Sequence, residues 1–513
     1  MVEITGTGIT ANQLYDWSHG SHGSPGRPGR PNFVLAAKAR AAVEESRSYI
    51  ARRLAAGEVM YGVNTGFGSF SSVRIEDSQI EELQKNIVRS HSTGVGQPFS
   101  RAQTRAIMIL RANALARGHS GVRPAVIEKI LEFLHADVLP VIPSQGSVGA
   151  SGDLAPLSHL ALALIGEGEA WPLALEDAKP VPVAELLAAK KIQPVELRFK
   201  EGLSLINGCQ VMTAIGLLSL VEALDLSLLA DVAGAMSLEA LRGSRSAFDD
   251  LISASRPHTG ERQTAARLRG LLGPSSEIGQ SHIGCSRVQD AYSLRCMPAV
   301  HGAAKDALRQ ALATLEVEAN SSTDNPLVFA KEEKILSCGN FHGMPVALAM
   351  DFAGIALSAM GSISEQRIAK LINPTMSGLP AHLALHGGLN SGHMIVQVSA
   401  ASLVSENKVL AHPASVDSIP TNLDKEDHVS MGTIAARKFE RIVENVRHIL
   451  AMEFLSACQG IDLLRPLKTS QTLEGFHAEI RQHVPFAKSD RVFSKDILKI
   501  ADLIRGRALV NQC

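Results

Sequence analysis

Apolar residues recur three and four positions apart along much of the chain, with charged residues between them. Residues 126–134 show this spacing behind Pro124, which occupies a favoured position at a helix start. Residues 439–450 repeat the pattern over several turns. The same periodicity predicts helices over residues 33–56, 103–117, 303–318 and 394–410. Strand signals are few and short, as at residues 59–61, so we expect a mainly α fold with several long helices.

Two stretches are apolar enough to raise the question of a membrane span. Residues 203–241 are interrupted by four acidic residues, and residues 346–372 contain Asp351, Glu365 and Arg367. A spanning helix needs about 20 apolar residues almost free of charge. We therefore expect both stretches to form buried helices, and we expect no membrane contact.

The composition narrows the class of protein. The chain has 513 residues, and 50 Lys and Arg against 51 Asp and Glu give a net charge of −1. Such a balance is unlike the basic surface of a nucleic-acid-binding protein, so we expect no nucleic acid as partner. The six cysteines are scattered without a CxxC motif, and the first residues lack the pattern of a secretory signal. These features favour a reducing compartment, and we expect the cytoplasm.

The sequence also predicts one mobile loop and a division of the chain into two regions. Residues 18–32 (SHGSHGSPGRPGRPN) are rich in Gly and Pro, which predicts a mobile loop. His19 and His22 lie in this segment without a carboxylate or thiol partner nearby, so we expect no metal site. We expect residues 1–206 to form an N-terminal, mostly helical domain. Residues 207–513 would then form the central long-helix bundle and a C-terminal helical region.

The densest cluster of small residues is GSVGASGDLAP at residues 146–156. It lacks both the GxGxxG spacing and the GK[ST] ending of a phosphate-binding loop, and no strand pattern precedes it. A glycine-rich connection between helices would account for this composition. Backbone chemistry offers another explanation.

The tripeptide Ala150-Ser151-Gly152 can cyclise through its own backbone. The amide nitrogen of Gly152 can attack the carbonyl carbon of Ala150. Loss of water from the ring and of the Ser151 hydroxyl then gives a 4-methylidene-imidazole-5-one, whose exocyclic carbon is electron-poor. Glycine suits the attacking position because it has no shielding side chain and tolerates a compressed backbone. Such an electrophile needs no metal and no external cofactor.

The run GSVGASGDLAPLSH resembles the signature of the aromatic amino acid ammonia-lyases, which form this group autocatalytically. Further blocks match the family in order between residues 61 and 464: YGVNTGFG (61–68), Asn207-Gly208, YSLR (292–295), Asn325-Pro326, GNFH (339–342) and EDHVSM (426–431). The resemblance implies a long-helix bundle subunit of the fumarase/aspartase-like and aromatic ammonia-lyase type. It also implies a homotetramer whose active sites are shared between subunits.

In this family an aromatic α-amino acid loses ammonia and leaves a trans-2,3-unsaturated acid. The β-hydrogen is weakly acidic and ammonia is a poor leaving group, so the electrophile must activate the amine while a base removes the proton. By resemblance, Tyr61 corresponds to that base. Arg295 corresponds to the clamp on the substrate carboxylate, a task that suits its planar guanidinium.

Four further positions correspond to residues of the family's pocket. Tyr292 and Asn207 match residues that orient the electrophile and the departing amine. Gln289 and Phe341 also fall on pocket positions, although ordinary core packing explains Phe341 equally well.

Two positions bear on the choice of substrate. His91 follows Ser90 in an order that resembles histidine ammonia-lyases, and some tyrosine aminomutases share it. Glu426 stands where phenylalanine- and tyrosine-specific relatives usually carry Gln. A carboxylate is favourable against an imidazole ring, which donates a hydrogen bond, and unfavourable against a phenyl ring. We therefore expect L-histidine as substrate and trans-urocanate as product.

Two alternatives remain. The first is a tyrosine or phenylalanine ammonia-lyase, or an aminomutase, of the same family, because a tyrosine hydroxyl can also pair with Glu426. The second is a catalytically silent helical scaffold, whose mass would lack the loss of two waters expected of the cyclised chain. The sequence departs from relatives at Cys209, where many carry Thr, at His393, where Phe is common, and at residues 422–425, which are more charged than usual.

Overall fold

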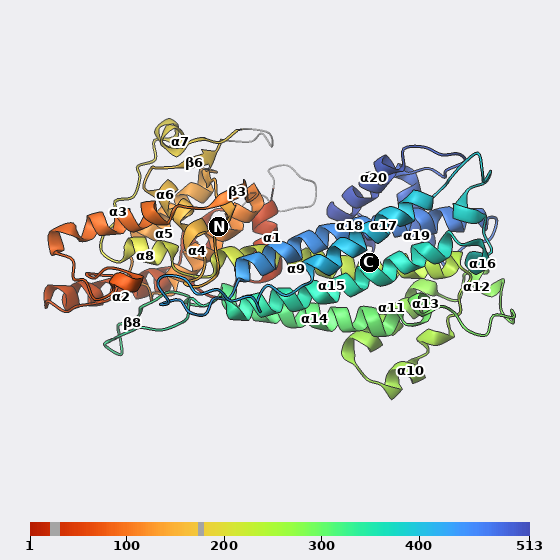
Figure 1. The fold of residues 1–513 in the computed structure, drawn as a ribbon, viewed down its shortest axis with the longest axis horizontal. Coiled ribbons are helices and arrows are strands. Elements are labelled where there is room, and N and C mark those ends of the chain that lie inside the picture. Colours follow the sequence, from red (N-terminus) through yellow and green to blue (C-terminus); the bar gives the residue numbers. More distant parts are fainter. Residues whose placement is uncertain (21–30, 173–178) are drawn as a thin grey trace. The chain divides into compact units, whose positions relative to one another are not determined.

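A computed structural model describes residues 1–20, 31–172 and 179–513 of the chain (Figure 1). Most of the loop predicted over residues 18–32 lies outside the described residues. The chain forms two compact units of three segments each. Unit 1 comprises Met1–Leu218, Leu312–Asp351 and Pro413–Arg437, and unit 2 comprises Ser219–Ala311, Phe352–His412 and Lys438–Cys513. The predicted division after residue 206 concerns the order of regions along the chain, and it stays a prediction.

Helices dominate both units, as the sequence predicts. Four of the five unit boundaries fall inside long helices, which are α9 (Gln210–Ala240), α14 (Met297–Ala319), α15 (Met344–Leu371) and α18 (Gly432–Leu463). The fifth lies between His412 and Pro413, after a helix has ended. Helix α14 contains the predicted stretch 303–318, and α18 contains residues 439–450. The prediction of a mainly α protein with long helices is therefore confirmed.

Helices α9 and α15 are long and apolar enough to cross a membrane by length and composition alone. In the structure, 78% of the most apolar stretch of α9 and 56% of that of α15 are buried inside the protein. Their charged side chains also have partners. His301 Nδ1 lies 2.9 Å from Asp231 Oδ1 of α9, and Arg367 of α15 donates to Glu453 Oε2 over 2.9 Å. Burial within the protein thus accounts for the apolar composition of α9, whereas α15 leaves a larger part of its apolar stretch exposed.

The described residues of unit 1 form four small sheets among its helices. Strands β1 and β2 pair in parallel, β3 pairs with β5, β4 with β6 and β7, and β8 with β9, the last three sheets being antiparallel. The elements that lie wholly in unit 1 are β1 (Val2–Ile4), α1 (Ala11–His19), β2 (Phe33–Leu35), α2 (Ala37–Ala55), α3 (Ile80–His91), β3 (Val95–Pro98), α4 (Arg101–Ala116), α5 (Pro124–His135), β4 (Leu139–Pro140), β5 (Pro143–Gln145), α6 (Leu154–Leu164), β6 (Glu169–Trp171), β7 (Val181–Pro182), α7 (Val183–Lys190), α8 (Glu201–Ile206), β8 (Leu327–Phe329) and β9 (Lys334–Leu336).

The elements that lie wholly in unit 2 are helical among the described residues. They are α10 (Asp250–Ser255), α11 (Thr259–Leu272), α12 (Glu277–Gln280), α13 (Tyr292–Arg295), α16 (Pro374–Ser377), α17 (Met394–Leu410), α19 (Gln471–His483) and α20 (Phe493–Arg505). Helix α17 has the bounds predicted from the apolar periodicity.

Two local predictions are wrong. The helix predicted from residue 33 begins only at Ala37, because Phe33–Leu35 pair as a strand with Val2–Ile4. Residues 59–61 form no strand. Instead, Asn64 Oδ1 accepts from the Met60 amide over 2.8 Å, and the Val63 amide donates to the Met60 carbonyl over 3.1 Å. These contacts bend the segment into a turn that has no neighbouring strand.

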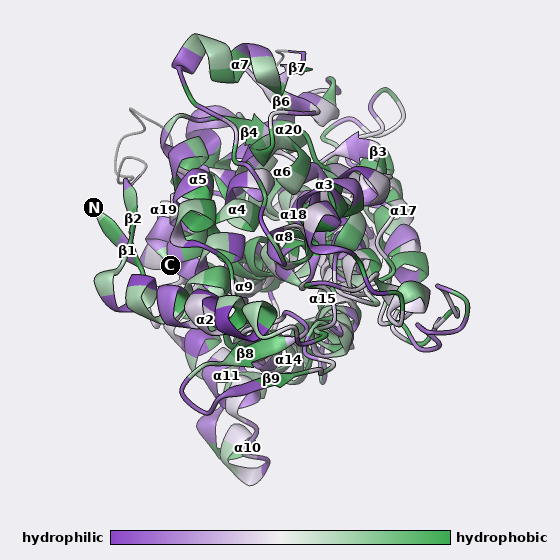
Figure 2. Ribbon diagram, turned by 90° about the vertical axis from the view of Figure 1, so that its left-hand side faces the viewer, coloured by the Kyte–Doolittle hydropathy of each residue, from purple (hydrophilic) through white to green (hydrophobic). Residues whose placement is uncertain are grey.

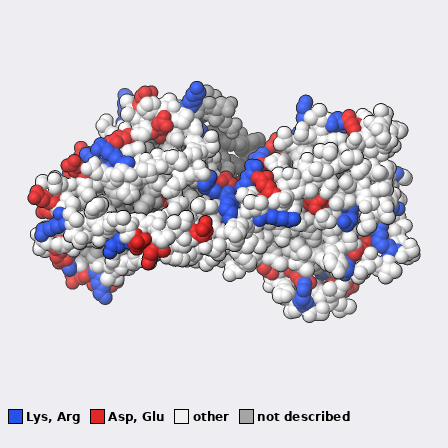
Figure 3. Space-filling model, viewed as in Figure 1, with Lys and Arg blue, Asp and Glu red and all other residues white. Residues whose placement is uncertain are grey.

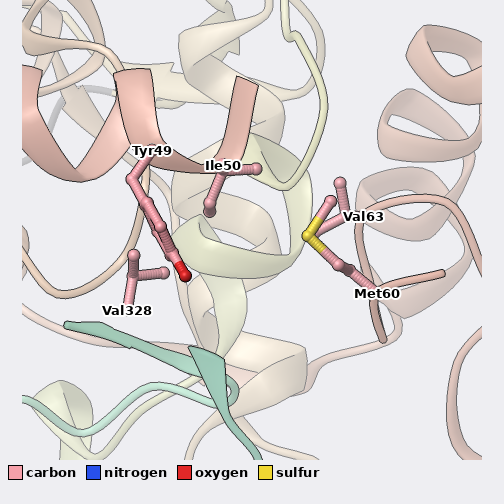
Figure 4. Close-up of a cluster of buried hydrophobic side chains, with 5 residues drawn as sticks. All are labelled: Tyr49, Ile50, Met60, Val63 and Val328. Atoms are coloured by element: carbon pink, nitrogen blue, oxygen red, sulfur yellow. The ribbon is translucent and has the colours of Figure 1, made fainter. Parts of the chain in front are cut away.

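This turn is held by a cluster of buried side chains in unit 1. Tyr49 and Ile50 of α2, Val328 of β8, and Met60 and Val63 on either side of residues 61 and 62 pack together (Figure 4). Helix α2 faces the cluster with one side only, and Figure 2 shows hydrophilic and hydrophobic residues interleaved along it. Apolar burial thus fixes both ends of the short segment that carries Tyr61.

The face of the protein drawn in Figure 3 carries charges of both signs. On the face drawn in Figure 3, Lys and Arg are interspersed with Asp and Glu, and the described residues form no extended region of one sign there.

Candidate active site

Unit 1 contains a cavity of about 1180 Å³. Its lining comes from segments that are far apart in the sequence. Seven residues proposed from the sequence meet there: Tyr61, His91, Ala150, Ser151, Asn207, Phe341 and Glu426.

The backbone at the Ala-Ser-Gly tripeptide is tightly constrained. Gly152 has a φ of +71° and forms a parallel bridge with Gly208, at the break between α8 and α9. A Cβ atom at residue 152 would lie 2.2 Å from the Gly208 carbonyl oxygen. Both the positive φ and the close approach therefore require glycine at this position.

Asp153, which follows the tripeptide, anchors it to the start of α9. Its Oδ2 accepts from the amides of Val211 and Met212, each over 2.9 Å. Its Oδ1 accepts from the hydroxyls of Ser147, over 3.1 Å, and of Thr433. Burial raises the pKa of Asp153 to about 6, although these hydrogen bonds oppose the shift. Asp153 was not recognised from the sequence, although its place directly after the tripeptide is an available signal.

Two contacts hold the segment before the tripeptide. Ser430 Oγ donates to the Gly149 carbonyl over 2.9 Å, and the Met431 amide donates to the Val148 carbonyl over 2.8 Å. The loop is thus fixed on one side by residues near the start of α9 and on the other by residues near the start of α18.

The phenolic oxygen of Tyr61 faces the backbone of the following turn. The Gly68 amide donates to Tyr61 Oη over 3.2 Å, and both residues line the cavity. A backbone N–H only donates, so the phenolic oxygen acts as the acceptor in this contact. The phenolic oxygen is thereby oriented at the cavity wall.

Glu426 connects the tripeptide to the opposite wall. Ser151 Oγ donates to Glu426 Oε1 over 3.2 Å, and Thr421 Oγ1 donates to Glu426 Oε2 over 2.8 Å. Two backbone hydrogen bonds between Thr421 and Glu426 close the short loop that carries them. Thr421 was not recognised from the sequence, because only the folded loop brings its hydroxyl to the carboxylate.

His91 ends α3 at the edge of the same cavity. Burial lowers the pKa of His91, and the negative charge of Glu426 opposes that shift. Ser90 Oγ lies 3.0 Å from His91 Nδ1. The two residues proposed to select the substrate therefore interact electrostatically.

Asn207 lies at the end of α8 and is 3% exposed. Its Nδ2 donates to Asp324 Oδ1 over 3.0 Å and to the Asn325 carbonyl over 3.3 Å. Its Oδ1 is buried without a hydrogen-bond partner. The cavity wall thus contains one unsatisfied acceptor.

Four predicted residues do not line this cavity: Gly152, which pairs with Gly208, and three residues outside unit 1. Gln289, Tyr292 and Arg295 belong to unit 2, where Tyr292 is 71% exposed. The Arg295 guanidinium lies over the Tyr292 ring, 4.5 Å from its centroid, and Arg295 Nε donates to the Asp290 carbonyl over 3.0 Å. The roles expected for these residues stay predictions.

A model of the family described as aromatic amino acid lyase matches residues 26–482. The chain belongs to this family. The resemblance and the fold class inferred from the sequence are thereby confirmed.

Among aromatic amino acid lyases, the chain is similar to a histidine ammonia-lyase of Sorangium cellulosum, with 52% identity over 485 residues and 93% of each chain covered. Among solved structures, it resembles histidine ammonia-lyase from Trypanosoma cruzi, with a TM-score of 0.91 and 42% identity. That match covers 100% of this chain and 94% of the other. Tyrosine aminomutase from Streptomyces globisporus gives a TM-score of 0.91 and 37% identity, with 100% and 98% covered. The fold is thus common to lyases and aminomutases. The residues that line the cavity must therefore determine which of the two reactions takes place.

Proposed function

We propose that this protein is an ammonia-lyase that converts L-histidine into trans-urocanate and ammonia without oxidation. The observation that carries the proposal is the position of Glu426, whose carboxylate lies in the cavity within hydrogen-bond distance of Ser151. An imidazole ring placed there would donate to the carboxylate, whereas a phenyl ring would leave it unpaired. The names of the similar proteins support this choice of substrate.

The electrophile we propose is a 4-methylidene-imidazole-5-one formed from Ala150, Ser151 and Gly152. The residues fit this group, because Gly152 has the positive φ and the close neighbour that exclude a side chain, and the Ser151 hydroxyl is a β leaving group. When formed, the group supplies the electron-poor carbon that activates the substrate amine.

The chain's own residues have distinct proposed tasks. Tyr61 accepts the β-proton at its phenolic oxygen, which the Gly68 amide orients. Asn207 offers its unpaired Oδ1 to the substrate's ammonium group. Glu426 and His91 contact the ring, and Phe341 closes the apolar wall.

A second copy of the chain would complete the site. We propose a homotetramer with shared active sites, in which Gln289, Tyr292 and Arg295 act in the cavity of another subunit. Arg295 supplies the two-pronged carboxylate clamp, since the described lining of the unit 1 cavity contains Lys425 but no arginine. Exposed apolar side chains on α15 and α17, among them Phe352, Ile355, Ile395 and Val398, support burial against other copies.

We also propose a cytoplasmic location and a role in histidine degradation. All six cysteines are free thiols in the structure, which suits a reducing compartment.

The decisive experiment combines intact mass with a substrate panel. Purified protein is expected to be lighter than its sequence by two waters and to build the ultraviolet absorbance of urocanate from L-histidine without added cofactor. Ser151→Ala should keep the unmodified mass and lose turnover while the thermal unfolding temperature stays close to that of the parent.

Other outcomes identify the alternatives. Turnover of tyrosine or phenylalanine in place of histidine, or appearance of a β-amino acid, would indicate another member of the family. An unmodified mass together with no turnover would favour the silent scaffold.

A further inference from the structure

The side-chain amide of Asn207 is held in one orientation by its neighbours. Its nitrogen faces the Asp324 carboxylate, 3.0 Å away, and the Asn325 carbonyl, 3.3 Å away. A carboxylate and a carbonyl only accept hydrogen bonds, so the NH₂ group must face them. The amide oxygen is consequently directed to the opposite side.

That oxygen is the unusual atom of the site. Asn207 is 3% exposed, yet its Oδ1 has no donor among the described residues, and the residue lines the cavity. A buried acceptor without a partner is unfavourable by about 1–3 kcal/mol. A ligand with N–H donors, such as an alkylammonium group, would satisfy it.

Asp324 is itself a fully satisfied, buried carboxylate. Its Oδ1 also accepts from the Asn325 amide over 2.7 Å, and its Oδ2 accepts from Lys200 Nζ over 2.8 Å and from Ser204 Oγ over 3.0 Å. Burial would raise the pKa of Asp324, but the positive charge of Lys200 and these hydrogen bonds outweigh it and hold the pKa below its usual value. The ionised carboxylate has no proton to donate, so it cannot accommodate a flipped Asn207 amide.

Lys200 balances this charge without reaching the cavity. Both Lys200 and Asp324 are almost completely buried, and neither lines the cavity. An isolated buried carboxylate would be costly, whereas the pair with Lys200 and Ser204 is neutral and hydrogen-bonded. Among Lys200, Ser204, Asp324 and Asn207, only Asn207 lines the cavity, and its Oδ1 atom has no hydrogen-bond partner among the described residues.

We propose that Asp324, balanced by Lys200, is a positioning residue that fixes the Asn207 amide with its oxygen toward the ammonium group of the substrate. This inference rests on the proposed function, because it assigns the amine of an α-amino acid to the cavity. Without the carboxylate, only the longer 3.3 Å contact with the Asn325 carbonyl would hold the amide nitrogen. The amide could then flip and present its NH₂ group to the ammonium, which repels it.

The test is the paired substitution Asp324→Asn with Lys200→Met, which removes both charges together. The new Asn side chain can donate to Asn207 and so permits the flip. We expect kcat/KM for L-histidine to fall by about 10- to 100-fold, the loss of one hydrogen bond to a charged group. The inhibition constant of the des-amino analogue 3-(imidazol-4-yl)propanoate should stay nearly constant, and the mass should still show the loss of two waters.

Two controls separate positioning from general damage. In an Asn207→Ala background the paired substitution should cause no further loss of kcat/KM, because Asp324 then has no amide to orient. Arg105→Met with Asp137→Asn removes another ion pair of unit 1, between residues that do not line the cavity. That control should lower thermal stability without a selective effect on the amine-bearing ligand.

Asp324→Glu provides a second variant should the paired substitution fail to fold. It keeps the charge but displaces the carboxylate by one methylene group, so the Asn207 amide oxygen is no longer aimed at the ammonium group and a smaller amine-selective loss is expected. Equal weakening of histidine and its des-amino analogue, or additive losses in the Asn207→Ala background, would overturn the proposal. A parent protein with the mature mass but no histidine turnover would refute the substrate instead, and the amine-selective comparison would then use the amino acid that is turned over.

Discussion

The Ser151 hydroxyl donates to Glu426 Oε1 over 3.2 Å, while the other carboxylate oxygen of Glu426 is held by Thr421. The proposed ring formation removes the Ser151 oxygen as water. Glu426 Oε1 then loses its donor, whereas Oε2 keeps the hydrogen bond from Thr421. Formation of the electrophile would therefore leave an oriented carboxylate with one oxygen available to the substrate ring.

Glu426→Gln should reduce kcat/KM for L-histidine by about 10- to 100-fold, because a neutral amide replaces a charged acceptor for the imidazole N–H. The intact mass should still show the loss of two waters, and thermal stability should change little. Steady-state kinetics with histidine and phenylalanine in parallel measure the effect. Equal activity of the variant and the parent toward histidine would refute the assignment of Glu426 to substrate selection.

Thr421→Val removes the hydroxyl that donates to Glu426 Oε2 and keeps the branched side chain. We expect kcat/KM to fall by about fivefold to tenfold, the usual contribution of one hydrogen bond of about 1 kcal/mol. Thr421→Ser retains the hydroxyl and should stay near the parent value. Parent-level activity in Thr421→Val would show that the hydrogen bond from Thr421 to Glu426 contributes nothing to catalysis.

Gly152→Ala should prevent maturation. The added Cβ would lie 2.2 Å from the Gly208 carbonyl oxygen, on a backbone with a φ of +71°. The variant is expected to keep the unmodified mass and to lose about 1–3 kcal/mol of stability through backbone strain. Gly57→Ala is a matched control, since Gly57 also has a positive φ but a Cβ there meets nothing within 4 Å. Mature mass in Gly152→Ala would contradict the requirement for glycine.

The buried side chain of His393 should make the free energy of unfolding of unit 2 depend on pH in the acid range. Burial, reinforced by the charges of Arg481 and Arg491, lowers its pKa to about 3, whereas an unfolded chain has a histidine pKa of about 6.5. As the pH falls below 6.5, the unfolded state binds a proton that the folded state excludes, so the free energy of unfolding decreases. Between pH 7 and pH 5 this group accounts for a loss of about 2 kcal/mol.

His393→Phe should flatten that dependence, because phenylalanine does not titrate and Phe493 already contacts the ring edge-on. Unfolding temperatures measured between pH 5 and pH 7 give the slope. His258→Asn, at an exposed position, should leave the slope of the parent unchanged. An equally steep slope in His393→Phe would show that other groups determine the acid sensitivity.

The long helices were predictable because their apolar periodicity is a local signal. Helix α17 has the predicted bounds, and α5 begins at Pro124 as expected. Strand β2 was not predictable from its own residues, since its pairing partner lies at Val2–Ile4. The turn at residues 60–63 was missed for a related reason: its apolar side chains pack into a cluster with residues of α2 and β8.

The residues of the site were predictable only where a family block marked them. Ser151, Asn207 and Glu426 stand in such blocks, and the cavity brings them together. The side chains that orient these residues, such as Asp324 and Thr421, do not belong to a family block that was recognised in the sequence. Asp324 acts on Asn207 across 117 positions of sequence, and this relationship exists only in the folded unit.

The contacts of the Ala-Ser-Gly loop also determine when its chemistry can occur during synthesis. Ser430, which donates to the Gly149 carbonyl, follows that residue by 281 positions, and Thr433 follows Asp153 by 280. A chain still attached to the ribosome lacks these partners until most of it has been translated. On the proposed chemistry, incomplete translation products therefore remain without the electrophile, and the thiols and amines of the cell meet it only inside a finished, folded protein.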